Sequence, residues 1–416
     1  MCDTGACFRI LPTTMLHDPA RHEPLQDLSW NEDAARAAIR HIAAEAEAQC
    51  REGRYWPVHP LDREGGDPDP VETPLYHGAA GVIWALHYLE DCGAVALGRD
   101  WLGDWESLLA ANRRWLAANA PGEQASWLMG DMPILMMALA RHPGLANELA
   151  RLVAANLAHP ARELMWGAPG TLLAARFLHE RTGEARWAAL FRETAATLWE
   201  QLAWSDEHGC AYWVQDLYGR RSSYLDAVHG FVATAVPLIQ GRHLLEAGAW
   251  TRWQDCIANT VRRTALWEGG QVNWQPQLFG TERENAKKLL QFCHGAPGFV
   301  ISLAGFPGEA LDDVLLGAGA ATWAAGPLAK GANLCHGTAG NGYAFLALYR
   351  RTGDRIWLER ARAFAMHALA QVERDARAYG QLRYSLWTGD LGLAIYLWDC
   401  IRAQAQFPTL DVFFVA

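Results

Sequence analysis

One short phrase recurs along this chain and constrains its fold more than any other feature. A glycine follows His, Cys-His or Trp, a second glycine often comes three residues later, and an apolar run follows. The leading glycines of the seven copies are Gly78, Gly130, Gly167, Gly230, Gly295, Gly337 and Gly389. Their average spacing of about 50 residues is typical of a protein built from repeated supersecondary units.

Each repeat also contains a second segment with a different pattern. These segments are rich in Ala, Leu, Glu and Arg, and their apolar residues recur at intervals of three and four, which predicts amphipathic helices. Examples are residues 104–120, 144–158, 185–203, 250–267 and 354–378. The runs behind the glycines are almost entirely apolar and predict buried helices. No segment alternates with a period of two for long enough to predict a sheet.

Seven amphipathic and seven apolar helices make seven helical hairpins, which stack as an open solenoid or close on themselves. Closure is favoured, because an open concave face would expose the apolar helices to water. The sequence therefore predicts an all-α fold, an α/α toroid with seven inner and seven outer helices. We expect one domain over 1–416, with an N-terminal outer helix and a Pro/Gly-rich connector in 1–75, repeats in 76–400 and a C-terminal tail in 401–416. Residues 51–74 form a connector or a lid.

The amino-acid composition argues against several classes of protein. Hydrophobic residues make up 51% of the 416 residues, enough for a large core, and the formal charge of -10 disfavours nucleic-acid binding. The nine cysteines have no spacing typical of a disulfide framework, and neither a signal peptide nor a membrane-spanning run is evident. We therefore expect a cytoplasmic protein with reduced cysteines. Most of the 20 tryptophans are expected in the core, while Trp166 and Trp387 fall at turns facing the mouth of the toroid.

Inner helices that all begin at glycine turns place the residues before those glycines at one end of the toroid. The residues gathered there are His77, Glu163, Trp166, His229, Cys293, His294, Cys335 and His336. Two cysteines and one histidine match a catalytic zinc site with an open fourth position. Both Cys-His pairs together would instead give a closed structural site, but neighbouring residues do not easily reach one ion. We favour the open site, whose chemistry suits activation of a sulfur nucleophile.

Four segments carry a resemblance to a known family. QFCHGAPG at 291–298, NLCHGTAGNGYAFLALY at 333–349, ELMWGAPGTLLAA at 163–175 and SLWTGDLGLAIYL at 385–397 resemble the motifs of the lanthionine synthetase C-like family. The resemblance runs from about residue 76 to residue 400. It implies a double ring of seven inner and seven outer helices and one zinc ion per chain. It also implies that Cys293, Cys335 and His336 are the zinc ligands.

The resemblance also implies a reaction. Bacterial cyclases of this family add a cysteine thiolate to dehydroalanine or dehydrobutyrine and so form a thioether. His229 matches the active-site histidine of the family and is expected to transfer the proton. Glu163 stands where the cyclases carry an aspartate four residues before the glycine. The longer side chain places cyclase activity in doubt.

The sequence of residues 330–345 more closely resembles the stand-alone branch of the family, which binds glutathione. That likeness implies a thiol substrate such as glutathione and a second substrate, a peptide or protein containing a dehydroamino acid. It implies that Lys330 pairs with a carboxylate of glutathione and that Arg9 or Arg383 pairs with another. Trp166 is a further candidate for contact with substrate.

Three other functions remain open from the sequence. One is a lanthipeptide cyclase that acts on a cysteine of the same peptide, and another is a non-catalytic adaptor that binds glutathione or peptide. The third is a glycoside hydrolase with the same fold, which needs paired carboxylates in the mouth. Only Glu163, Asp131 and Asp390 are candidates for such a pair.

Overall fold

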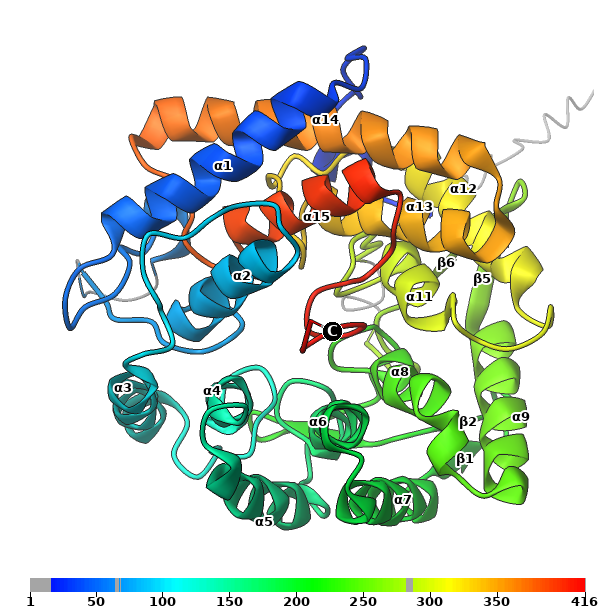
Figure 1. Cartoon of the computed structure of the whole chain (residues 1–416). Helices are drawn as coiled ribbons and strands as arrows, with labels where there is room; N and C mark the ends of the chain where they lie inside the picture. Colours follow the sequence, from blue (N-terminus) through cyan, green and yellow to red (C-terminus); the bar gives the residue numbers. More distant parts are fainter. Residues whose placement is uncertain (1–15, 64–66, 68, 282–286, 416) are drawn as a thin grey trace, which may run out of the picture.

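The computed structural model describes residues 16–63, 67, 69–281 and 287–415. Within these residues, fourteen α-helices form two concentric rings (Figure 1), and this confirms the predicted α/α toroid. Arg9 lies outside the described residues.

The inner ring contains the helices that follow the glycine turns. They are α2 (Ala79–Asp91), α4 (Met132–Ala138), α6 (Ala168–Thr182), α8 (Phe231–Gln240), α11 (Ala296–Leu303), α13 (Thr338–Thr352) and α15 (Asp390–Arg402). Packing on all sides explains their apolar composition. In α13, for example, every residue from Thr338 to Leu348 is buried.

The outer ring contains the amphipathic helices, which bury one face against the inner ring. They are α1 (Glu32–Gln49), α3 (Trp105–Asn119), α5 (Ala146–Asn156), α7 (Ala185–Glu200), α9 (Ala247–Thr264), α12 (Asp312–Ala325) and α14 (Arg355–Tyr379). Helix α1 packs against α15 and α14, and α15 also contacts α2, so the last repeat meets the first.

The described part of the chain also contains three short β-hairpins that were not predicted. They are β1 (Ala203–Ser205) with β2 (Cys210–Tyr212), β3 (Gln215–Leu217) with β4 (Arg220–Ser222), and β5 (Ala265–Glu268) with β6 (Gln271–Trp274). The helices expected over 185–203 and 250–267 therefore end early. Strands of three or four residues are too short to show a period of two. Gly269 and Gly270 between β5 and β6, both at positive φ, were the available hairpin signal.

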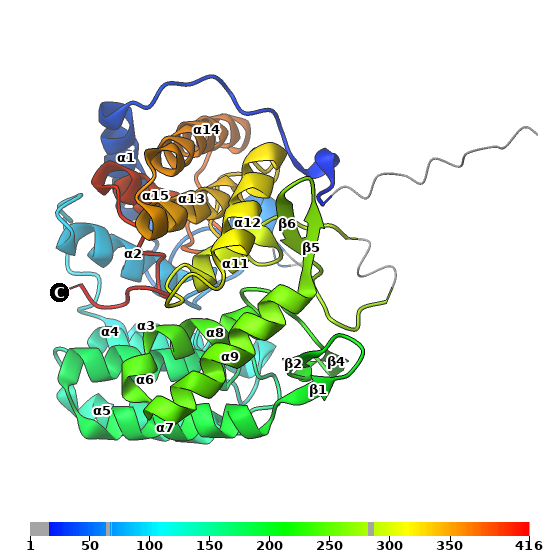
Figure 2. The same ribbon diagram turned by 90° about the vertical axis from the view of Figure 1, so that its right-hand side faces the viewer.

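The hairpins and the turns before the inner helices gather at one end of the ring. Figure 2 shows the hairpins on the side of the molecule opposite the C-terminus. We call the end with the turns the mouth.

At two inner helices, α8 and α13, the residue before the helix provides no side-chain cap, and the turn itself satisfies the first N–H groups. At α11 the side chain of Asn273 accepts the first N–H group, that of Ala296. At α13 the N–H groups of Thr338, Ala339 and Gly340 donate to carbonyls seven residues earlier in the chain. The N–H groups of the first residues of α8 are satisfied in the same way. This loop geometry replaces the Ser, Thr or Asp that usually caps a helix.

Backbone hydrogen bonds also join the turns of neighbouring repeats. They connect residues that lie two positions before the leading glycines. The bonds run from Cys293 N to Cys335 O, from Cys335 N to Trp387 O, from Trp387 N to Tyr76 O, from Tyr76 N to Leu128 O and from Leu128 N to Met165 O. We call this series the turn ladder. It brings the two candidate ligand cysteines together.

The second glycine of the repeat allows the turns to approach this closely. A Cβ atom at Gly340 would overlap the carbonyl oxygen of Leu334 and lie 3.2 Å from the Cβ of Phe292 in the neighbouring turn. A side chain at this position would therefore push apart the turns that carry Cys335 and Cys293.

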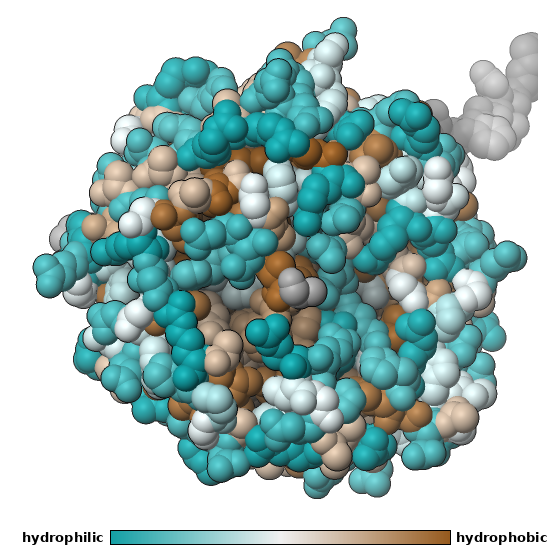
Figure 3. Space-filling model, in the orientation of Figure 1, coloured by the Kyte–Doolittle hydropathy of each residue, from teal (hydrophilic) through white to brown (hydrophobic). Residues whose placement is uncertain are grey.

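The C-terminal tail enters the ring from the end opposite the mouth (Figure 1). The ring of Phe413 lies 5.3 Å from that of Trp127 and 6.0 Å from that of Phe177. Phe407 stacks on Phe292 at 4.5 Å. On this face, apolar side chains show at the centre of the ring, while the periphery is mostly hydrophilic (Figure 3). The tail therefore fills the centre of the toroid.

Among the described residues, no helix combines the length and the apolar character that crossing a bilayer requires.

Candidate functional site

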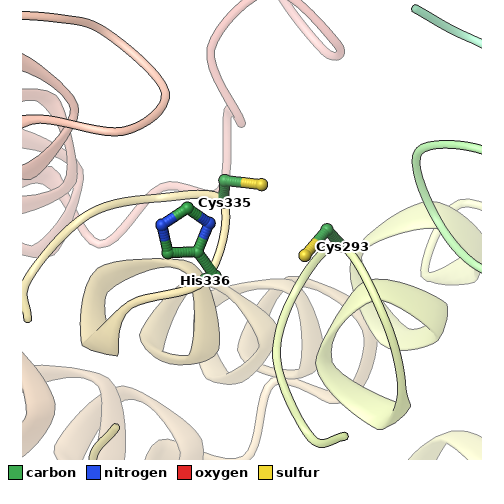
Figure 4. A group of neighbouring side chains, drawn as sticks. All are labelled: Cys293, Cys335 and His336. Carbon is green, nitrogen blue, oxygen red and sulfur yellow. The ribbon is translucent and has the colours of Figure 1, made fainter. Parts of the chain in front are cut away.

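The turns before α11 and α13 bring together the three predicted metal ligands. The ligand atoms of Cys293, Cys335 and His336 all lie within 4.8 Å of one another (Figure 4). Both cysteines are buried, and the backbone bond from Cys293 N to Cys335 O measures 3.0 Å. The turn ladder therefore holds the sulfur atoms side by side.

This set of donors fits zinc. Two thiols and an imidazole are the groups that zinc prefers, and three protein ligands leave a fourth tetrahedral position open. His294 is not part of the group, because its Nδ1 lies 2.8 Å from the carboxylate Oδ2 of Asp226. The arrangement therefore favours three ligands over four.

Each candidate ligand sulfur accepts one hydrogen bond from a neighbouring side chain. The hydroxyl of Tyr76 donates to Cys335 Sγ at 2.9 Å, and the amide Nε2 of Gln291 donates to Cys293 Sγ at 3.0 Å. Hydrogen bonds from Cys293 and Tyr76 lower the pKa of the Cys335 thiol, although burial opposes them. The same contact with Cys335, together with burial, raises the pKa of the Cys293 thiol, so the pair favours one thiolate, on Cys335. The thiolate is the form of cysteine that binds a metal.

A histidine–carboxylate pair lies in the neighbouring turns. His229 Nδ1 lies 2.8 Å from Glu163 Oε2, and Glu163 is completely buried. Burial by itself would lower the pKa of His229, but the hydrogen bond and the charge of Glu163 outweigh it and raise the pKa to about 9. The ring of His229 lies 6.4 Å from that of His294, which directly follows Cys293. The imidazolium therefore lies in the same mouth as the three candidate ligands.

Residues four positions before the leading glycines also shape the turns. Glu163 accepts the backbone N–H groups of Met165 and Trp166, and Asp226 accepts those of Val228 and His229. Burial opposes ionisation of Asp226, but the imidazoles of His294 and His229 lower its pKa. Each acid therefore holds its own turn and also orients one histidine.

A cavity of about 520 Å³ opens beside His336. The connector supplies one wall of this cavity through Trp56, His59 and Asp62, so these residues lie at the mouth. Other residues of the wall are Tyr76, His77, Trp115, Lys330, Tyr384 and Thr388. Burial lowers the pKa of His77 to about 4, which keeps this imidazole neutral at physiological pH.

The predicted cationic residues differ in their positions. Lys330 lines the cavity. Arg383 is 7% exposed, and its Nε lies 3.9 Å from Asp62 Oδ2, so its guanidinium already faces a carboxylate of the connector. Burial raises the pKa of Asp62, although Arg383, His336 and Lys330 oppose this effect.

The two tryptophans expected to face the mouth do not line the cavity. The indole N–H of Trp166 donates to the hydroxyl of Tyr218, and Trp387 is completely buried with its N–H bonded to Thr409. Trp56 and Trp115 line the cavity instead. Trp387 lies in the turn ladder, where neighbouring turns cover its side chain.

The two other carboxylates considered for a glycosidase have structural partners. Asp131 Oδ2 lies 2.7 Å from Nε of Arg113 on α3, and Asp390 accepts the backbone N–H of Arg383. Neither residue lines the cavity.

Three residues of the site escaped sequence reasoning: Tyr76, Gln291 and Asp226. Tyr76 lies two residues before Gly78, as Cys335 does before Gly337, while Gln291 and Asp226 lie four residues before their glycines. Aligning the repeats on the leading glycines would have identified these positions, although not the partners of the side chains.

The model of the lanthionine synthetase C-like proteins matches residues 69–412. The chain belongs to the lanthionine synthetase C-like family. This finding confirms the resemblance carried by the four motifs.

Two curated relatives match part of this lanthionine synthetase C-like chain. Glutathione S-transferase LANCL1 of Danio rerio is 38% identical over 130 residues, which are 30% of this chain and 32% of the relative. LanC-like protein GCL1 of Arabidopsis thaliana is 37% identical over 134 residues, 30% of this chain and 31% of the relative. The matched segments thus span about a third of these relatives.

Among solved structures, nisin cyclase has a similar fold. The match has a TM-score of 0.53 at 14% sequence identity, and it covers 89% of this chain and 100% of the cyclase chain. At this identity the likeness supports the α/α toroid of the lanthionine synthetase C-like chain and not a particular reaction.

Proposed function

We propose that this protein is a zinc-dependent enzyme that forms thioethers by adding a thiol to dehydroalanine or dehydrobutyrine residues. The observation that carries the proposal is the grouping of Cys293, Cys335 and His336 within 4.8 Å, in the same mouth as the His229–Glu163 pair. A metal-ligand set beside a proton-transfer pair suits sulfur addition, which needs an activated thiol and a proton for the product.

Cys293, Cys335 and His336 would hold one zinc ion per chain. When bound, zinc lowers the pKa of a thiol that reaches its open coordination position. Of the three candidate ligands, His336 lines the cavity, and both cysteines are buried. A thiol that enters the cavity would therefore approach the ligand group from the side of His336.

His229 would supply the proton. When the sulfur bonds to the β-carbon of the dehydroamino acid, the electron pair of the C=C bond moves to the α-carbon, which must take a proton. An imidazolium with a pKa near 9 is the protonated form at neutral pH. Glu163 holds the ring in place and stabilises its positive charge.

Glutathione is the thiol we propose. Lys330 in the cavity wall would pair with one of its carboxylates. Arg383 would pair with a second carboxylate of glutathione, and Asp62 would have to move away from the guanidinium first. The name of the Danio rerio relative, glutathione S-transferase LANCL1, supports this choice. We place the reaction in the cytoplasm, where glutathione keeps the ligand cysteines reduced.

The test uses the full-length protein loaded with zinc. It is incubated with a dehydroalanine peptide, with and without glutathione, and the products are analysed by mass spectrometry. We expect a thioether adduct that requires glutathione and is lost in Cys335→Ala. Absence of an adduct in both incubations would overturn the proposal.

Metal analysis tests the site separately. We expect one zinc per wild-type chain and loss of that zinc in Cys293→Ala. Retention of equimolar zinc by Cys293→Ala would contradict the proposed ligands. Cys256→Ala is the matched control, because Cys256 lies on the outer helix α9.

Two alternatives give different outcomes in the same experiments. A lanthipeptide cyclase would close a peptide that carries both cysteine and dehydroalanine, and it would do so without glutathione. A non-catalytic adaptor would bind glutathione equally well in wild type and in Cys335→Ala, and would form no adduct.

A further inference from the structure

The proposed reaction brings three sulfur atoms into one mouth together with an electrophile. Two belong to Cys293 and Cys335, and the third belongs to the substrate. A thiolate of the protein is itself a nucleophile toward dehydroalanine. Addition at Cys335 would form a C–S bond to the β-carbon and place a proton on the α-carbon, and the enzyme would lose a ligand. The site therefore needs a way to distinguish its own sulfurs from that of the substrate.

The two protein sulfurs share a feature that offers this distinction. Each accepts one hydrogen bond from a side chain that is not a candidate ligand: Tyr76 donates to Cys335, and Gln291 donates to Cys293. A hydrogen bond withdraws electron density from a thiolate and makes it a weaker nucleophile. An incoming substrate sulfur receives neither of these bonds.

The orientation of Gln291 follows from its second partner. A guanidinium nitrogen of Arg21 lies 3.0 Å from Gln291 Oε1. Because arginine only donates hydrogen bonds, the oxygen of the amide must face Arg21, and the NH₂ group must face the sulfur. Arg21 belongs to the N-terminal segment, which pairs with the turn before Cys335 through Ala329 N and Arg21 O. Arg21 thus holds Gln291 in the donating orientation.

Two kinds of contact fix the position of Tyr76. Its backbone belongs to the turn ladder, and its ring lies 5.8 Å from that of Trp387, the ladder residue between Tyr76 and Cys335. The length of the tyrosine side chain lets its hydroxyl reach the sulfur across the intervening repeat.

We propose that Tyr76 and Gln291 are positioning residues whose hydrogen bonds shield the ligand cysteines from the electrophile, so that addition occurs at the sulfur of the substrate. The need for shielding rests on the proposed function, but the shielding itself can be measured without turnover.

The experiment measures alkylation of each cysteine in the full-length, zinc-loaded protein. Iodoacetamide forms an S–C bond and releases iodide, and it needs neither glutathione nor a dehydroamino acid. Cleavage after Lys288, Lys330 and Arg350 separates Cys293 from Cys335 into two peptides, 289–330 and 331–350. Mass spectrometry then gives both rates from one digest. Cys50, a free cysteine just past α1, serves as the internal reference.

Each variant is expected to change the alkylation rate of one particular cysteine. Tyr76→Phe should raise alkylation of Cys335 about tenfold relative to Cys50 and leave Cys293 within about twofold of wild type. Gln291→Met should give the reverse pattern. Tyr384→Phe, which removes a hydroxyl from the same cavity wall, should change neither rate. The same pattern is expected when a dehydroalanine peptide replaces iodoacetamide and no thiol is added.

Equal rates at both cysteines, or a parallel rise at Cys50 such as unfolding produces, would overturn the proposal. Arg21→Met is a second test, because it leaves the core unchanged and only frees the Gln291 amide to rotate. It should raise alkylation of Cys293 alone, and an unchanged rate would count against the role of Arg21. Failure to form a thioether with glutathione would contradict the proposed function and leave this alkylation pattern intact.

Discussion

The pair formed by His229 and Glu163 links the chemistry of the site to pH. Glu163, Asp226 and Cys293 all raise the pKa of the imidazole against the effect of burial, and the hydrogen bond and charge of Glu163 are the main causes of its raised value of about 9. A folded-state pKa above the ordinary value of 6.5 means that the pair stabilises the fold fully below pH 6.5. That contribution is lost as the pH rises through 9.

Replacing Glu163 with glutamine should therefore move the pH dependence of the reaction. Without the carboxylate, burial dominates, and the pKa of His229 should fall from about 9 to 6.5 or below. At pH 8 the rate of thioether formation should decrease about thirtyfold or more, because the protonated fraction of His229 falls by that factor, and the alkaline limb of the pH–rate profile should shift toward acid. An unchanged limb would show that His229 does not supply the proton.

Lys330 is the residue that should determine affinity for a thiol with a carboxylate. Lys330→Gln should raise KM for glutathione about tenfold, because it removes one charge-assisted hydrogen bond. Cysteamine, a thiol without a carboxylate, should be affected little. Lys287→Gln is the matched control, since Lys287 lines a different cavity. An equal increase in KM for both thiols would contradict this role.

At the scale of elements, the spacing of the two glycines controls how closely neighbouring turns approach. Gly340→Ala should lower the free energy of unfolding by about 2 kcal/mol, because the new Cβ would overlap the Leu334 carbonyl next to Cys335. The affinity of the Gly340→Ala protein for zinc should also fall. Urea unfolding and competition with a chelator measure the two effects.

Gly248→Ala provides the control for this substitution. Gly248 lies in the outer helix α9, and a Cβ there would have no neighbour within 4 Å. Alanine should raise the free energy of unfolding by about 0.5 kcal/mol, because it is the better helix former. Loss of zinc affinity in Gly248→Ala would show that the loss in Gly340→Ala does not depend on the approach of neighbouring turns.

At the scale of the whole molecule, the C-terminal tail joins repeats that are distant in sequence. Phe413 is 4% exposed and contacts rings of α2 and α6, together with Trp127 in the turn before α4. Phe413→Ala should lower the free energy of unfolding by about 3 kcal/mol, as expected for a buried phenylalanine. Phe414→Ala, at the half-buried neighbouring position, should cost less than half as much. A loss of less than about 1 kcal/mol in Phe413→Ala would show that the tail is not part of the core.

Much of the architecture follows from the sequence by itself. The repeated glycines and the two helical patterns predicted fourteen helices, their arrangement in two rings and the end at which the site lies. The resemblance of the motifs named Cys293, Cys335 and His336, which the structure brings within 4.8 Å. Periodicity identifies the helices and the turns because each depends on residues close together in the chain.

Only the tertiary structure decided which side chains meet at the mouth. Tyr76 and Cys335 are 259 residues apart, and Arg21 and Gln291 are 270 residues apart. Their contacts exist because the ring closes and places the first repeat beside the last. The buried tail and the carboxylate of Asp62 beside Arg383 were equally out of reach. No local pattern encodes them, since each depends on which turns the turn ladder and the packing of the inner helices make neighbours.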